Sequence, residues 1–87
     1  MKYNLKGNAE TREVWLDDKL LTPEESQRYR NHSPDGFSWG YCGSGPAQLA
    51  LAIMLEINSK AFGYQEFKWK ELAQLDQDED FEIEFNL

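Results

Sequence analysis

The segment "PAQLALAIMLEI", residues 46–57, constrains the fold of this chain more than any other. Its apolar residues follow helical spacing and also fill most of the positions between. A helix that is apolar around most of its circumference has to be covered on nearly all sides. The sequence therefore predicts a central, buried helix from Pro46 to about Lys60, around which the other residues pack.

The glycine-rich stretch "GYCGSGP", residues 40–46, predicts how that helix begins. Proline suits the first helical position, so Pro46 predicts a start there with Gly45 or Ser44 as the cap. If Gly45 is the cap, Gln48 is at the third position and can reach back to a free backbone N–H.

Period-two alternation elsewhere predicts an antiparallel sheet. Residues 2–7 and 13–16 alternate around a Gly7-Asn8 turn signal and predict a β-hairpin, and a second tight turn then leads to a short extended piece at residues 20–21. "FSWGY", residues 37–41, predicts a short strand with its three aromatic side chains on one side. "FEIEFNL", residues 81–87, alternates strictly and predicts a strand with an acidic wet face.

Two further segments predict small helices. Thr22 before Pro23, with Glu25 three residues after the threonine, has the form of a capping box and starts a short helix. Residues 64–75 alternate in part, but their spacing favours a helix. The prediction is a single α+β domain, residues 1–87, with three or four antiparallel strands packed on one buried helix and one or two short helices.

The charge balance excludes several function classes. Sixteen acidic and nine basic side chains give a net charge of −7. Direct nucleic-acid binding through phosphates needs the opposite sign, as does a basic helix on a membrane surface. The longest apolar run is too short to span a membrane, no secretory signal is visible, and one cysteine cannot form an internal disulfide. We expect a cytoplasmic protein.

The glycine-rich turn is the first candidate binding site. Free N–H groups at a helix start attract anions, so Gly43, Ser44, Gly45 and Gln48 are candidates for a nucleotide or phosphate site. The lysine of a phosphate loop and the third glycine of a dinucleotide fingerprint are both missing. The alternative interpretation is that these glycines serve backbone geometry.

No complete catalytic or metal-binding set is present. Cys42 and His32 meet the minimum for a nucleophile and base, but no third group orients the histidine. The acidic run that begins at Asp76 lacks the glycine and the closing glutamate of a calcium loop. We therefore expect no catalytic residues, no metal and no cofactor.

A cluster of carboxylates near the C-terminus is the main candidate for binding a partner: Asp76, Asp78, Glu79, Asp80, Glu82 and Glu84. Glu10, Glu13, Asp17 and Asp18 join it if the first and last strands are neighbours. Rows of carboxylates on a rigid domain can imitate nucleic acid and occupy a basic channel on another protein. The alternative is a solvated surface that keeps the protein soluble.

The central segment resembles a family of small uncharacterised proteins from bacterial, archaeal and phage genomes. The resemblance rests on "SPDGF", on "WGY", and on "GSGPAQLALAI", residues 43–53, with Tyr64, Phe67 and Lys68 following. Cys42 falls at the variable position of the motif. The resemblance implies no activity, but the phage members suggest an accessory or counter-defence role.

These observations favour a non-enzymatic binding protein whose acidic residues contact a basic partner. A phage-encoded inhibitor of a host nucleic-acid-processing protein, such as a nuclease, is the most specific form of this hypothesis. A nucleotide-binding protein that uses the glycine-rich turn is the alternative, and an enzyme that uses Cys42 is a third. A homodimer formed by strand addition stays open.

Overall fold

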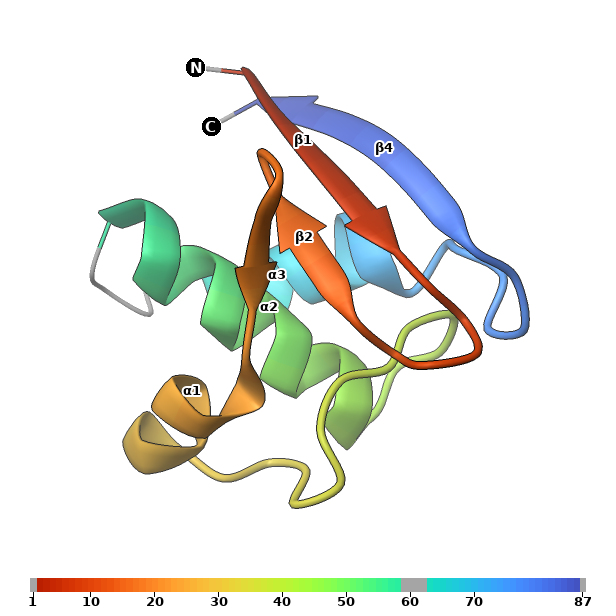
Figure 1. Cartoon of the computed structure of the whole chain (residues 1–87). Helices are drawn as coiled ribbons and strands as arrows, with labels where there is room; N and C mark the ends of the chain where they lie inside the picture. Colours follow the sequence, from red (N-terminus) through yellow and green to blue (C-terminus); the bar gives the residue numbers. More distant parts are fainter. Residues whose placement is uncertain (1, 59–62, 87) are drawn as a thin grey trace.

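A four-stranded antiparallel sheet packs with one face on three helical segments (Figure 1). The computed structural model describes residues 2–58 and 63–86. The sheet order is β3-β2-β1-β4, and the strands are β1 (Lys2–Gly7), β2 (Val14–Leu16), β3 (Lys19–Leu21) and β4 (Phe81–Asn86). The helices are α1 (Pro23–Tyr29), α2 (Ser44–Asn58) and α3 (Tyr64–Phe67), which continues into a π-helical turn, η1 (Lys68–Leu72). The predicted α+β fold is confirmed.

The first and last strands pair along their whole length. Tyr3 lies opposite Phe85, Leu5 opposite Ile83, and Gly7 opposite Phe81. The two ends of the described chain therefore lie side by side (Figure 1). The tight turn predicted after β2 is also present, because Asp17 and Asp18 have positive φ angles of 48° and 67° and join β2 to β3 directly.

Helix α2 is the most buried element, as its composition predicted. Every residue from 45 to 54 is buried. The helix begins at Ser44, two residues earlier than predicted, so Pro46 is its third residue. Its predicted end at Lys60 lies outside the described residues.

The predicted strand at residues 37–41 is wrong. These residues form an irregular segment in which Phe37 and Trp39 are buried while Tyr41 is 38% exposed. The cause is Gly40, whose φ of 85° breaks the extended conformation. A Cβ at this position would lie 2.5 Å from the backbone nitrogen of Gln77, so the close approach also requires glycine.

The flanking helical predictions are confirmed in outline. Thr22 precedes α1 and Pro23 is its first residue, but the Thr22 side chain makes no capping hydrogen bond. The segment after Gly63 is helical, as favoured, although its second half is the π-helical turn η1 rather than a continuous α-helix.

Gly7 ends β1 and was interpreted as a turn residue, but the structure assigns it a packing role. It pairs with Phe81 across the strands, and a Cβ at Gly7 would lie 2.2 Å from the Phe81 ring. The ring therefore uses the space that any other residue at position 7 would fill. On its other side Phe81 meets Trp39 edge to face, with 4.7 Å between ring centroids.

We expect Gly7→Ala to lower the free energy of unfolding by about 1–3 kcal/mol, because the added methyl displaces the Phe81 ring. Chemical denaturation measures the change. In a Phe81→Val background the same substitution should cost much less, since the ring is gone. An equal cost in both backgrounds would show that the contact does not govern this position.

Candidate functional site

The outer face of the sheet is not covered by any of the helices (Figure 1). The side chains on this face come from alternate positions of all four strands. They are Lys2, Asn4, Lys6, Trp15, Leu20, Glu82, Glu84 and Asn86. Leu20 is 43% exposed and Trp15 is half-buried, so apolar surface lies beside the charged rows.

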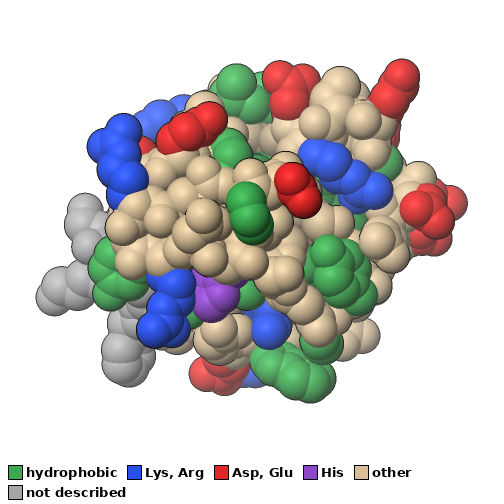
Figure 2. Space-filling view, turned by 90° about the horizontal axis from the view of Figure 1, so that it is seen from below, with side chains coloured by type: hydrophobic (Ala, Val, Ile, Leu, Met, Phe, Trp, Pro, Cys, Tyr) green, Lys and Arg blue, Asp and Glu red, His purple; other side chains and the backbone are tan. Residues whose placement is uncertain are grey.

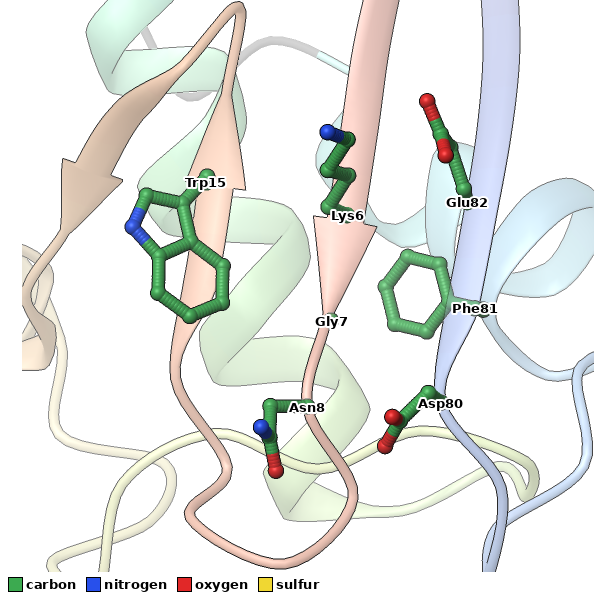
Figure 3. A pocket seen from close by; sticks show the side chains of 7 residues that line it. All are labelled: Lys6, Gly7, Asn8, Trp15, Asp80, Phe81 and Glu82. Atoms are coloured by element: carbon green, nitrogen blue, oxygen red, sulfur yellow. The ribbon is translucent and has the colours of Figure 1, made fainter.

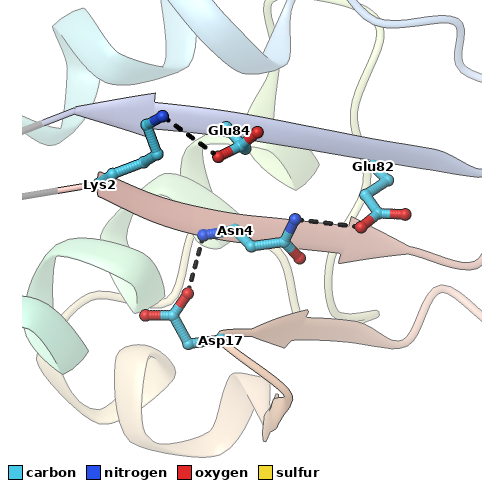
Figure 4. A network of polar contacts seen from close by, with 5 residues as sticks. All are labelled: Lys2, Asn4, Asp17, Glu82 and Glu84. Carbon is cyan, nitrogen blue, oxygen red and sulfur yellow. Dashed lines mark hydrogen bonds and ion pairs between the residues drawn. The ribbon is translucent and has the colours of Figure 1, made fainter.

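Polar contacts connect β1 with its two neighbours on this face (Figure 4). The Asn4 backbone N–H donates to Asp17 Oδ1 at 2.8 Å, and Asn4 Nδ2 donates to Glu82 Oε2 at 3.1 Å. Lys2 Nζ lies 3.7 Å from Glu84 Oε2. The side chains of that last pair are 64% and 61% exposed, so this ion pair contributes little to stability.

A shallow hollow opens on the same face, near the end of β1 (Figure 3). The Trp15 ring lies on one side of it, the Asp80 and Glu82 carboxylates lie on the other, and Lys6 rises between them. An aromatic ring beside carboxylates is suited to a partner that presents both apolar and cationic groups.

Some carboxylates of the acidic loop before β4 accept hydrogen bonds from the backbone, and others form no ion pair with a described residue. Asp80 Oδ1 accepts a hydrogen bond from the Ala9 backbone N–H at 2.7 Å, and Asp76 Oδ1 accepts one from Asp78 at 2.9 Å. The Asp78 and Glu79 side chains are exposed, and no described residue forms an ion pair with them. The loop is thus held in place while part of its charge faces solvent.

The structure brings the six predicted carboxylates into one continuous region, the loop of residues 76–80 and the strand β4. We call this region the acidic edge. The β1–β2 connection, which carries Glu10 and Glu13, is bonded to it through Ala9. Asp17 lies beyond β1, bonded to Asn4. The lysines of β1 lie between these groups, so the negative surface is interrupted on the sheet and continuous only along β4 and its loop.

Trp15 was missed as a functional candidate, although the sequence carried the signal. Val14 and Leu16 on either side of it are fully buried or nearly so. Strand alternation therefore places Trp15 on the opposite, outer face.

The glycine-rich turn is tightly packed. A Cβ at Gly43 would lie 2.5 Å from the Tyr41 ring, and a Cβ at Gly45 would lie 2.6 Å from Ser38 Cβ and 2.8 Å from the Tyr41 hydroxyl oxygen. Gly45 itself is buried, whereas Ser44 is exposed. Both glycines thus permit close packing at the start of α2.

Gln48 does not cap the helix as predicted, because both the oxygen and the nitrogen of its side-chain amide form hydrogen bonds with other groups. Oε1 accepts hydrogen bonds from the backbone N–H groups of His32 and Ser33, at 2.7 and 2.9 Å. Nε2 donates to Ser26 Oγ at 2.8 Å and to the Arg30 carbonyl at 3.1 Å. The side chain is completely buried and ties α1 and the following loop to α2.

His32 belongs to a different arrangement from the one predicted for a catalytic pair. Its Nε2 lies 2.8 Å from the Tyr64 hydroxyl, and no hydrogen bond joins it to Cys42, which is exposed. Burial lowers the pKa of His32, and the charges of Arg30 and Lys68 lower it further. Figure 2 shows basic side chains on both sides of the histidine on the lower face of the molecule.

No group of three or more histidine, cysteine, aspartate or glutamate side chains in residues 2–58 and 63–86 is arranged to hold a metal ion. No helix in the same ranges is long and apolar enough to cross a membrane.

A family model described as a family of unknown function (DUF6166) matches residues 4–86. The chain belongs to this family. The DUF6166 match includes β1 from Asn4 onward, the other three strands, α2 and the acidic edge, so these features are parts of one family domain. No curated protein and no solved structure matches the chain.

In this DUF6166 protein we expect Gln48→Leu to lower the free energy of unfolding by about 3 kcal/mol. The substitution keeps the volume but leaves the partly buried N–H groups of His32 and Ser33 and the Arg30 carbonyl without this partner, and a fully buried group left unpaired costs about 1–3 kcal/mol. Chemical denaturation measures the loss. Gln65→Leu, at an exposed position on α3, is the control and should change stability by less than about 0.5 kcal/mol. Equal effects would contradict the structural role of Gln48.

We expect His32 to titrate below its ordinary value of 6.5 when followed by NMR. Lys68→Gln should move the midpoint up, while Lys6→Gln on the sheet face should not. The pKa of His32 is lower in the folded protein than in the unfolded chain, so the unfolded chain binds more protons. The contribution of His32 to stability is therefore present above pH 6.5 and is lost as the pH falls through the folded pKa. A midpoint at or above 6.5 would contradict this account.

Proposed function

We propose that this protein is a non-enzymatic binding protein that contacts a basic protein partner through the acidic edge. One observation carries the proposal: β4 is an outermost strand, and the six acidic residues of the strand and its loop are all exposed, Asp78 and Glu79 without an ion pair to any described residue. A basic partner is favoured by the net charge of −7 and by the position of these groups on a paired strand and a hydrogen-bonded loop.

Apolar side chains on the outer face of the sheet, on β2 and β3, support a protein partner over a free cation. Trp15 and Leu20 lie on the outer face of the same sheet, where Trp15 is half-buried and Leu20 is 43% exposed. Tryptophan is enriched among the residues that contribute most to protein interfaces, where charged groups typically form the rim. Under this proposal Trp15 is an anchor and the acidic edge gives orientation and a faster encounter.

A nucleic-acid-processing protein is the partner class that fits best, because it has a basic channel that carboxylates on a rigid edge can occupy. The resemblance to a family with phage members supports the more specific proposal of an inhibitor that protects a phage from a host defence protein. Both forms of the proposal require the same contact surface.

The test is an affinity capture from the native cells, with identification of bound proteins by mass spectrometry. The combined variant Asp78→Lys, Glu79→Lys, Glu82→Lys, Glu84→Lys should lose a basic partner that the unmodified protein retains. The binding should also weaken as salt is raised, because exposed charges are screened.

The matched control keeps the acidic edge and changes charge elsewhere. Glu24→Lys with Glu25→Lys alters exposed residues of α1 and should leave the partner bound. Circular dichroism checks that each variant is folded. If the partner binds the acidic-edge variant as well as the unmodified protein at low salt, the proposal is wrong.

A further inference from the structure

The hydrogen-bond pattern of β1 shows which backbone groups of β4 are free. The Asn4 carbonyl accepts from the Asp17 N–H at 2.8 Å, so the Asn4 peptide groups face β2. In an antiparallel ladder, successive residues direct these groups to opposite sides. The N–H and C=O groups of Tyr3, Leu5 and Gly7 therefore point toward β4.

Across the ladder, the N–H and C=O groups of their partners Phe85, Ile83 and Phe81 point toward β1. It follows that Glu82, Glu84 and Asn86 direct their N–H and C=O groups away from the sheet, to the open side of β4. No strand of the described chain pairs with β4 on this side, and Figure 1 shows it as the outer border of the sheet. Such an edge is a template for an additional strand.

The side chains of β4 make the two faces of this edge chemically different. Glu82 and Glu84 lie on the outer face, and both are exposed. On the inner face Phe81 and Ile83 are only partly buried, although they pack against the core. A strand added here would meet carboxylates on one face and apolar side chains on the other.

A second copy of this chain is disfavoured by charge. An antiparallel pairing of two β4 strands centred on Glu84 places the two Glu84 side chains directly opposite each other. Like charges at this position destabilise a pair of strands, and each copy carries a net charge of −7. The edge is complementary to a basic strand.

We propose that the open edge of β4 binds an extended segment of the partner as a fifth strand, with basic residues at every second position and apolar residues between them. This inference rests on the proposed function and specifies how the partner presents its charge. The basic side chains pair with Glu82 and Glu84 across the strands, while the peptide backbone bonds to the N–H and C=O groups of Glu82, Glu84 and Asn86. The Lys2–Glu84 pair is too exposed to prevent this.

Three synthetic peptides test the proposal. The first alternates arginine with valine; the second has the same composition with its arginines contiguous; the third is the first with methyl groups on alternate backbone nitrogens, so that it cannot donate to the edge. We expect the first to bind at least about tenfold more tightly than either of the others. The contiguous peptide cannot place all its arginines on the face of Glu82 and Glu84, because strand side chains alternate between faces. The methylated peptide loses backbone hydrogen bonds to the edge.

Amide hydrogen exchange, followed by NMR, locates the binding. In the free protein Phe81, Ile83 and Phe85 should exchange slowly and Glu82, Glu84 and Asn86 quickly. The alternating peptide should slow exchange at the latter three. Glu82→Gln with Glu84→Gln should weaken binding, whereas Glu24→Gln with Glu25→Gln, which removes the same charge from α1, should not.

The outcomes separate this inference from the proposed function. If the contiguous and methylated peptides bind as tightly as the alternating one and the edge amides stay unprotected, strand addition is wrong while charge-driven contact stands. If the edge amides are already protected in the free protein in a concentration-dependent way, a second copy occupies the edge and the inference is also wrong. If no basic peptide binds and no basic partner is captured, both proposals fail.

Discussion

The need to cover α2 on nearly all sides determines the rest of the structure. The sheet supplies one wall, α1 and α3 supply others, and the irregular segment around Trp39 closes the remaining side. Within this apolar environment Gln48 is the exception, since it is buried and forms four hydrogen bonds to the segment of residues 26–33. That amide holds the segment in place, because all four of its hydrogen bonds go to this segment.

Covering the helix has a consequence for function. In a domain of this size only one face of the sheet is buried against the core, so the outer face and the edges of the sheet stay open to solvent. Open edges invite aggregation, and charged side chains are a common protection. Here the carboxylates that discourage self-pairing of β4 are the same groups that the proposed function assigns to a basic partner, so one set of charges would serve both purposes.

Membership of a family of unknown function, matched over residues 4–86, places the candidate surface within a domain that other chains share. The family assigns no activity, so the chemistry of the surface itself is what bears on function. The acidic edge, the hollow beside Trp15 and the free backbone groups of β4 lie next to one another, whereas the glycine-rich turn is occupied by its own packing against Tyr41.

Local patterns in the sequence determined the buried helix, the alternating strands, the turn at Asp17-Asp18 and the acidic character of β4, because each depends on residues within a few positions. Only the tertiary structure decided that β4 pairs with β1, that Gly7 makes room for Phe81, and that Gln48 bonds to α1 and its loop. It also decided against a strand at residues 37–41, because Gly40 packs against Gln77 far along the chain. These contacts join residues separated by long stretches of sequence, and periodicity carries no information about such distances.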